Sequence, residues 1–111
     1  MGFKVDVKSH LDDVLGNEAA AIYLAMNMIG EQAESYAKES LTQSGAVDTG
    51  RLRNSVTNLP EERKVTVGTN VEYSTYIEFG TSKMAPRPYI KPAVFDHLDE
   101  YKQMILSQLQ G

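Results

Sequence analysis

Apolar side chains recur at three- and four-residue steps through the first half of the chain. This spacing places them on one face of an α-helix, and it persists for about six turns. We therefore predict a long helix from residue 18 to residue 42, in which Gly30 marks a close contact or a slight bend. The apolar positions are Ile22, Ala25, Ile29, Ala33, Tyr36, Ala37 and Leu41.

Three shorter stretches carry the residue pattern of β-strands. The first covers residues 3–7, and two β-prone runs at 55–59 and 64–68 are separated by the turn residues 60–63. These two runs predict a hairpin at about residues 55–68. Because an isolated hairpin is barely stable in water, we expect it to join strand 3–7 in a small antiparallel sheet on the long helix.

Capping residues predict further helical segments. Ser9 can cap a short helix that ends at residue 15, and Asp48 or Thr49 can cap a single turn over residues 50–54. Pro92 fits the first position of a last helix, where its missing N–H costs nothing. The apolar stripe of that helix comprises Val94, Leu98, Tyr101, Ile105 and Leu109.

Residues 71–79 fit two structures. A strand would place apolar side chains on one face, but Thr75 interrupts the alternation. A short helix would begin at the capping residue Asn70 and end at Gly80. We favour the helix, because boundary residues stand at both of its ends. The prolines that follow Gly80 require extended backbone before them.

Length and composition describe one soluble domain. The chain has 111 residues, of which 41% are apolar and 23% charged, so one modest core forms. We predict a single α+β domain over residues 1–111, in which the long helix and a C-terminal helix pack on the sheet. The longest apolar run, residues 19–26, is too short to span a membrane. The first ten residues lack the apolar segment of a signal peptide, so we expect folding in a cytoplasm.

Charge and cysteine content remove several classes of function. The formal charge of −4 argues against a protein that clamps nucleic acid, which needs clustered cations. The absence of cysteine removes disulfides, thiolate nucleophiles and Cys-type metal sites. His10 and His97 lack partners at ligand spacing, and Glu72 and Glu78 do not share a helical face. We therefore predict that the chain is not an enzyme and holds no metal, cofactor or small-molecule ligand.

One triplet resembles a catalytic motif. Asp48, Thr49 and Gly50 spell the aspartic protease sequence, and the chain length would suit half of a retroviral-type homodimer. In those proteases the triplet follows a hydrophobic strand in an all-β fold, whereas here it follows the predicted long helix and precedes Arg51. A capped helical turn is the better interpretation, and proteolysis remains a remote alternative.

Aromatic residues and arginine gather in the C-terminal third of the chain. Tyr73, Tyr76 and Tyr89 stand near Arg87, and tyrosine and arginine are both enriched in protein interfaces. Taken singly, these tyrosines are more typical of the edge of a core, but their clustering beside Arg87 fits a surface that binds another protein.

Three motifs in register resemble one known family. They are VDTGRLRNSV at 47–56, VGTNVEYSTYIEFGTSKM at 67–84 and PRPYIKPA at 86–93. Together they resemble the head-tail joining, or tail-completion, proteins at the neck of long-tailed bacteriophages, and the resemblance covers about residues 3–109. Thr75 departs from the family pattern, since many relatives carry proline there.

The resemblance implies a structural virion protein that is assembled in the cytoplasm of a bacterial host. Such proteins form rings, usually sixfold, which contact themselves and other neck or tail proteins and let DNA pass without specific binding. The family positions that become interface or motif candidates are Arg51, Arg53, Tyr73, Tyr76, Glu78, Phe79, Gly80, Arg87 and Pro88. Those with a turn or capping role are Asp48, Thr49, Gly50 and Pro92.

The resemblance also leads to a hypothesis about the contact between copies. Residues 73–88 would form one patch of a head-to-tail interface, in which an arginine pairs with an acid such as Glu78. The competing interpretation is a small cytoplasmic adaptor or regulator that binds one protein partner. The neighbouring genes distinguish the two, because only a phage protein is expected between portal and tail-tube genes.

Overall fold

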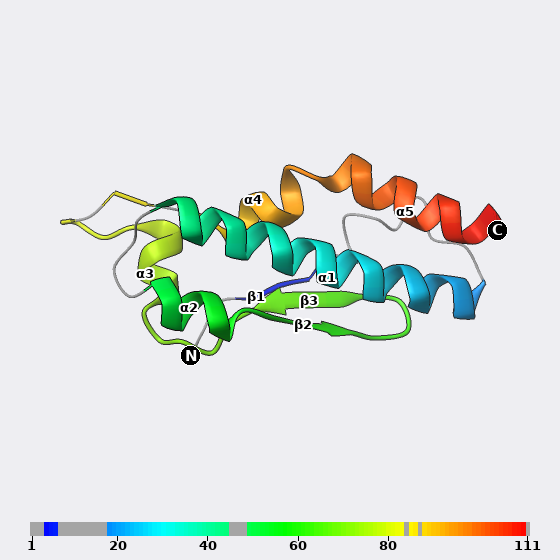
Figure 1. The fold of residues 1–111 in the computed structure, drawn as a ribbon, viewed down its shortest axis with the longest axis horizontal. Helices are drawn as coiled ribbons and strands as arrows, with labels where there is room; N and C mark the ends of the chain where they lie inside the picture. Colours follow the sequence, from blue (N-terminus) through cyan, green and yellow to red (C-terminus); the bar gives the residue numbers. More distant parts are fainter. Residues whose placement is uncertain (1–3, 7–17, 45–48, 84, 87, 111) are drawn as a thin grey trace.

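A computed structural model describes residues 4–6, 18–44, 49–83, 85–86 and 88–110 (Figure 1). The fold is α+β, as the sequence predicts, and the predicted helix at 9–15 lies outside the described residues. In chain order the elements are β1 (Lys4–Asp6), α1 (Ala19–Ser44), α2 (Thr49–Ser55), β2 (Thr57–Pro60), β3 (Val65–Gly68), α3 (Ser74–Phe79), α4 (Ile90–Phe95) and α5 (Leu98–Gln110).

The three strands form one antiparallel sheet in the order β1-β3-β2. In the hairpin, Thr57 pairs with Gly68 and Pro60 with Val65, while Val5 of β1 pairs with Val67 on the other side of β3. The backbone N–H of Glu61 donates to the carbonyl of Lys64 across the turn at 2.7 Å. The predicted hairpin and its N-terminal partner strand are therefore confirmed.

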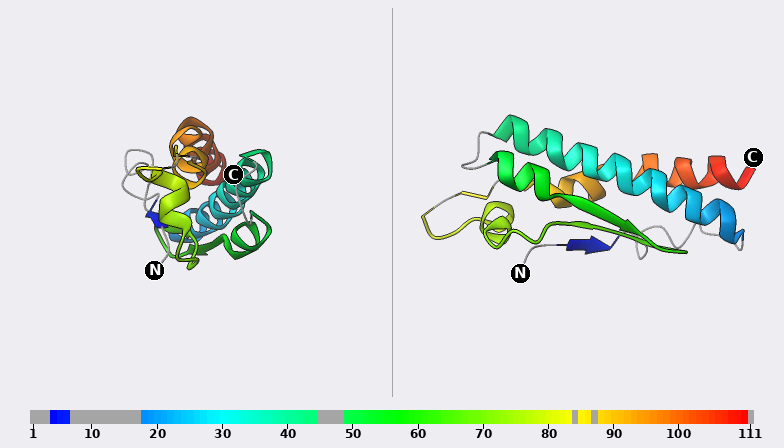
Figure 2. Two further views of the ribbon diagram at one scale, coloured as in Figure 1. Left: turned by 90° about the vertical axis from the view of Figure 1, so that its left-hand side faces the viewer. Right: turned by 60° about the horizontal axis from the view of Figure 1, so that its bottom comes forward.

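Helix α1 runs most of the length of the molecule, between the sheet and the helices α4 and α5 (Figures 1 and 2). The molecule measures 47 Å by 20 Å by 20 Å. Val65 and Val67 of β3 are fully buried on the covered face of the sheet, whereas Leu59 on the opposite face is 58% exposed. The apolar stripe predicted for the long helix lies in the same buried cluster as these valines, except for Tyr36, which is partly buried and packs against the cluster.

Gly30 lies where α1 crosses the hairpin. A Cβ at this position would stand 2.4 Å from Oδ1 of Asn58 and 2.8 Å from Cγ2 of Val65. Asn58 is itself fixed, because its amide donates to Glu34 at 2.9 Å. The close contact predicted from the sequence is therefore present, and it lets the helix approach the sheet.

Replacing Gly30 with alanine is expected to lower the free energy of unfolding by about 1–3 kcal/mol, because overpacking outweighs the gain of about 1 kcal/mol in helix propensity. Chemical denaturation measures the change. Ser35→Ala, at an exposed position of the same helix, should be neutral or slightly stabilising, and equal effects of the two changes would contradict the packing argument.

The C-terminal helical region differs from its prediction in two ways. It begins at Ile90 instead of Pro92, and it divides into α4 and α5 at Asp96 and His97. Pro92 is the third residue of α4, where its lack of an N–H still breaks no intrahelical bond. The division arises because the N–H of His97 bonds to Val94 only three residues back, at 3.4 Å, before the ordinary spacing resumes.

Tyr101 fastens α5 to α4. Its side chain is fully buried, and its hydroxyl donates to the backbone carbonyl of Ala93. Burial raises the pKa of this hydroxyl above its usual value near 10, and the neighbouring Glu100 and Tyr36 raise it further.

The raised pKa predicts a loss of stability at alkaline pH. Above about pH 10 the unfolded chain releases the Tyr101 proton while the folded chain retains it, so unfolding becomes more favourable as pH rises. Tyr101→Phe should lose about 1 kcal/mol at pH 7, since Ala93 loses its partner, and should lose less stability between pH 10 and 11 than the native chain. Denaturation at pH 7, 10 and 11 measures both effects; parallel curves for the two proteins would contradict the assignment.

Candidate functional site

The predicted interface residues gather at one end of the molecule. Helices α2 and α3 lie at this end, and the described parts of the segment between α3 and α4 extend beyond them (Figures 1 and 2). We call residues 80–88 the basic loop. Thr81, Ser82, Lys83, Ala85, Pro86 and Pro88 are all exposed. Arg87, a predicted interface residue, lies outside the described residues, as does the predicted cap Asp48.

Residues 74–79 form helix α3, which confirms the preferred interpretation of this stretch. The helix ends at Gly80, whose φ of 76° suits glycine and whose N–H donates to the carbonyl of Tyr76 at 2.8 Å. Its start differs from the prediction: Tyr73 occupies the capping position without a side-chain cap, and Asn70 does not. The hydroxyl of Thr69 accepts a hydrogen bond from the N–H of Val71 at 3.1 Å, and this bond stabilises a turn ahead of the helix.

Glu78 caps a different helix. Its side chain is only 2% exposed, and Oε1 accepts from the N–H groups of Tyr89 and Ile90 at 3.2 and 3.0 Å. Oε2 accepts from the N–H of Lys91 at 3.1 Å. These are the otherwise unsatisfied N–H groups at the start of α4, where a negative charge is also favourable.

This arrangement assigns Glu78 a role within one chain. Both carboxylate oxygens are engaged and the side chain is buried, so Glu78 is not free for the arginine pair between copies considered from the sequence. It explains instead why α4 begins at Ile90. Glu78 lies on α3, which precedes the basic loop, and it accepts hydrogen bonds from the start of α4, which follows the loop. It therefore fixes both ends of the basic loop.

The outer side of α3 carries two exposed aromatic residues. Tyr76 is 58% exposed and Phe79 is 48% exposed, while Ile77 between them is buried. The ammonium group of Lys91 lies 4.4 Å from the centre of the Phe79 ring, within the range of a cation–π interaction. Aromatic residues are enriched in protein interfaces, so the exposed pair Tyr76 and Phe79 favours an interface on this side of α3.

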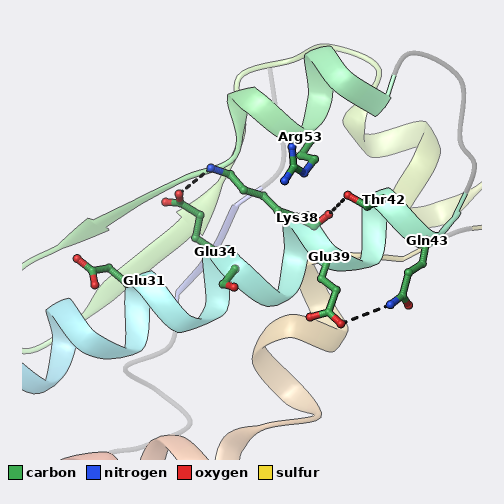
Figure 3. Close-up of a pocket in the computed structure, with 8 residues that line it drawn as sticks. Glu31, Glu34, Lys38, Glu39, Thr42, Gln43 and Arg53 are labelled. Carbon is green, nitrogen blue, oxygen red and sulfur yellow. Dashed lines mark hydrogen bonds and ion pairs between the residues drawn. The ribbon is translucent and has the colours of Figure 1, made fainter.

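The two arginines of α2 have different surroundings. The guanidinium carbon of Arg51 lies 5.5 Å from the centre of the Tyr73 ring, so Arg51 holds α2 against the segment that leads into α3. Arg53 is exposed and lines an open groove between α1 and α2 (Figure 3).

Helix α2 begins at Thr49 and Gly50, which confirms the helical turn predicted for this stretch. In aspartic proteases the Asp-Thr-Gly triplet stands in an all-β fold, whereas here it stands in an α+β fold.

The groove in Figure 3 is polar. Lys38 forms an ion pair with Glu34 at 2.9 Å on the side of α1 that faces α2, and Glu34 also accepts from Asn58. Glu39 and Gln43 point to the other side of α1, toward α4 (Figure 3). Within the described ranges, no three His, Cys, Asp or Glu side chains could hold a metal ion, and no described helix is long and apolar enough to cross a membrane.

Sequence reasoning missed a contact between α1 and the turn before α5. His97, for which the sequence indicates no partner at ligand spacing, is half-buried and stacks on Tyr36 with 3.7 Å between ring centres. The Tyr36 hydroxyl donates to Glu100 at 2.6 Å, and Nδ1 of His97 lies 3.5 Å from the same oxygen. The hydrogen bond to Glu100 raises the pKa of Tyr36. Helical periodicity placed Tyr36 on the inner face of α1, but no local signal pairs residues sixty positions apart.

Comparison with known proteins identifies one family. A family model described as "Bacteriophage HK97-gp10, putative tail-component" matches residues 7–80, about two thirds of the chain. The matched range includes α1, α2, the hairpin and α3. No curated protein and no solved structure matches the chain.

Proposed function

Because the chain belongs to the HK97 gp10-like family of phage tail components, we propose that it joins tail to head as part of a ring at the neck of the virion. In this role it either completes the tail or connects it to the head. Its partners are other copies of itself, six in the ring, together with neighbouring neck or tail proteins. It works in the virion after assembly in the host cytoplasm.

One observation supports this proposal above the others: the exposed aromatic residues Tyr76 and Phe79 lie together on helix α3, with Lys91 beside Phe79, at one end of an elongated molecule. A ring requires head-to-tail contacts, in which one patch meets a different patch on the neighbour. The outer side of α3 and the basic loop provide one such patch. The formal charge of −4 favours a ring whose lumen repels DNA and lets it slide.

The proposal carries no catalytic step and no cofactor. The polar hollows of the described surface are open, and their side chains are paired with one another or solvated. Binding to proteins therefore accounts for the exposed residues without a reaction.

Gold labelling of virions tests the location. The gene in the phage that encodes the chain is extended so that a short peptide tag follows Gly111. Gold-conjugated antibody against the tag is then located on virions by electron microscopy. Label at the junction of head and tail is the expected result. Label at the tail tip, or none on intact particles, would contradict the proposal, while an untagged phage controls for nonspecific binding.

A further inference from the structure

A second hollow adjoins the groove of Figure 3 and shares Glu39 and Gln43 with it. It has a volume of about 270 Å³ and is open to solvent. It lies between the C-terminal half of α1 and the turn that connects α4 to α5. This size is below that of ordinary small-molecule pockets. The residues that matter here are Tyr36, Glu39, Gln43, Pro92, Asp96 and His97.

The hollow has a rigid aromatic wall. The rings of Tyr36 and His97 are stacked, with only 6° between their planes. Glu100 holds both rings in place from behind through the contacts described above. Aromatic surfaces of this kind bind proline-rich segments, whose stiff backbone loses little entropy on binding.

The hollow is also acidic. Glu39 and Asp96 both line it and both are exposed. No cation lies within ion-pair distance of either carboxylate among the described residues, and Glu39 accepts only a long bond of 3.4 Å from Gln43. His97 is the sole ionisable base in the described lining. Two carboxylates beside an aromatic wall therefore face solvent without a positive partner.

The basic loop has the complementary chemistry. Residues 80–88 contain two cations, Lys83 and Arg87, and no acid; since the whole chain carries −4, the rest of it carries −6. The buried Glu78 at the start of the loop is occupied by backbone N–H groups, so it does not pair with these cations. Pro86 and Pro88 are exposed and stiffen the loop.

We propose that the hollow binds the basic loop of a second copy of the chain, an inference that rests on the proposed function. Lys83 pairs with Glu39 or Asp96, and a proline packs on the Tyr36–His97 pair. A second copy is the occupant that the charges favour, because the basic loop of charge +2 meets a surface of opposite sign on an identical chain. The contact is head-to-tail: every copy offers one loop and one hollow.

The absence of cysteine allows a direct test. One copy of the full chain carries Ser82→Cys in the loop, and a second, of different mass through a tag, carries Gln43→Cys in the hollow. Both positions are exposed. Under mild oxidation the mixed disulfide should form at least tenfold faster than that between Ser82→Cys and a Ser107→Cys control, whose position on α5 is also exposed. Equal rates would overturn the proposal.

Charge reversal tests the pairing. Adding Lys83→Glu to the loop copy should bring the rate down to that of the control, and adding Glu39→Lys or Asp96→Lys to the hollow copy should restore it at least in part. Circular dichroism of each variant verifies the fold. If the mixed disulfide is not favoured while virion labelling still locates the chain at the neck, this contact fails and the proposed function stands. If labelling does not locate the chain at the neck while the mixed disulfide is favoured, the contact stands and the proposed function fails.

Discussion

Replacing Glu78 with alanine is expected to lower the free energy of unfolding by about 3 kcal/mol or more. The carboxylate satisfies three N–H groups at the start of α4, and two of these bonds are buried. Removing it leaves donors without partners, and each costs about 1–3 kcal/mol. Loss of negative charge at a helix N-terminus adds to the effect. Urea denaturation followed by circular dichroism measures it.

Two further variants make the test specific. Glu72→Ala removes an exposed carboxylate just ahead of α3, the helix that carries Glu78, and should change stability by no more than about 0.5 kcal/mol. Glu78→Gln keeps an acceptor oxygen but loses the charge, so its effect should lie between the other two. If Glu78→Ala proves as mild as Glu72→Ala, the carboxylate does not hold α4 in place.

Replacing Tyr76 and Phe79 together with serine is expected to abolish incorporation into virions while leaving the fold intact. Both side chains are about half exposed, so their loss should change the free energy of unfolding little. Aromatic anchors in interfaces each contribute about 2 kcal/mol or more, so losing both should weaken association about a thousandfold or more. Complementation of a phage that lacks the gene, followed by immunoblots of purified particles, measures incorporation.

The chain offers a matched control at its other end. Tyr23 and Leu24 are exposed to similar extents, 46% and 55%, and replacing both with serine removes a comparable apolar area. This control variant should be incorporated normally if the α3 end is the interface. Equal loss of incorporation for both double variants would show that the effect is not specific to α3.

The sequence predicts those elements whose signals are local. The long helix follows from one apolar stripe, the hairpin from two β-prone runs, and the end of α3 from Gly80. Gly30 also announced its close contact, because glycine inside a good helix is costly unless another element comes near. In each of these cases the residue pattern and the tertiary packing favour the same structure.

Features that depend on distant partners could not be predicted in this way. Glu78, twelve residues ahead of Ile90, sets the start of α4. Capping rules consider only adjacent residues, so they predicted that the helix begins at Pro92. Asn70 is a good capping residue by type, but Thr69 provides the hydroxyl that orders the turn. The stacking of His97 on Tyr36 needs the relative placement of two helices, which periodicity does not supply.

The same limit applies to the candidate site. Exposure of Tyr76 and Phe79 agrees with their selection as interface residues from composition and resemblance. Glu78 was selected for the same reasons, but its carboxylate is directed into its own chain. A residue type that marks a family position therefore does not reveal whether the position serves folding or contact, and burial separates the two.

Electron microscopy of particles made without the chain tests the central claim most directly. The gene is deleted from the phage that encodes it, and lysates are examined with and without a plasmid that supplies the native protein. We predict DNA-filled heads and separate tails that fail to join, with joined virions restored by the plasmid. Normal numbers of joined, infectious virions in the absence of the chain would contradict a role at the head-tail junction.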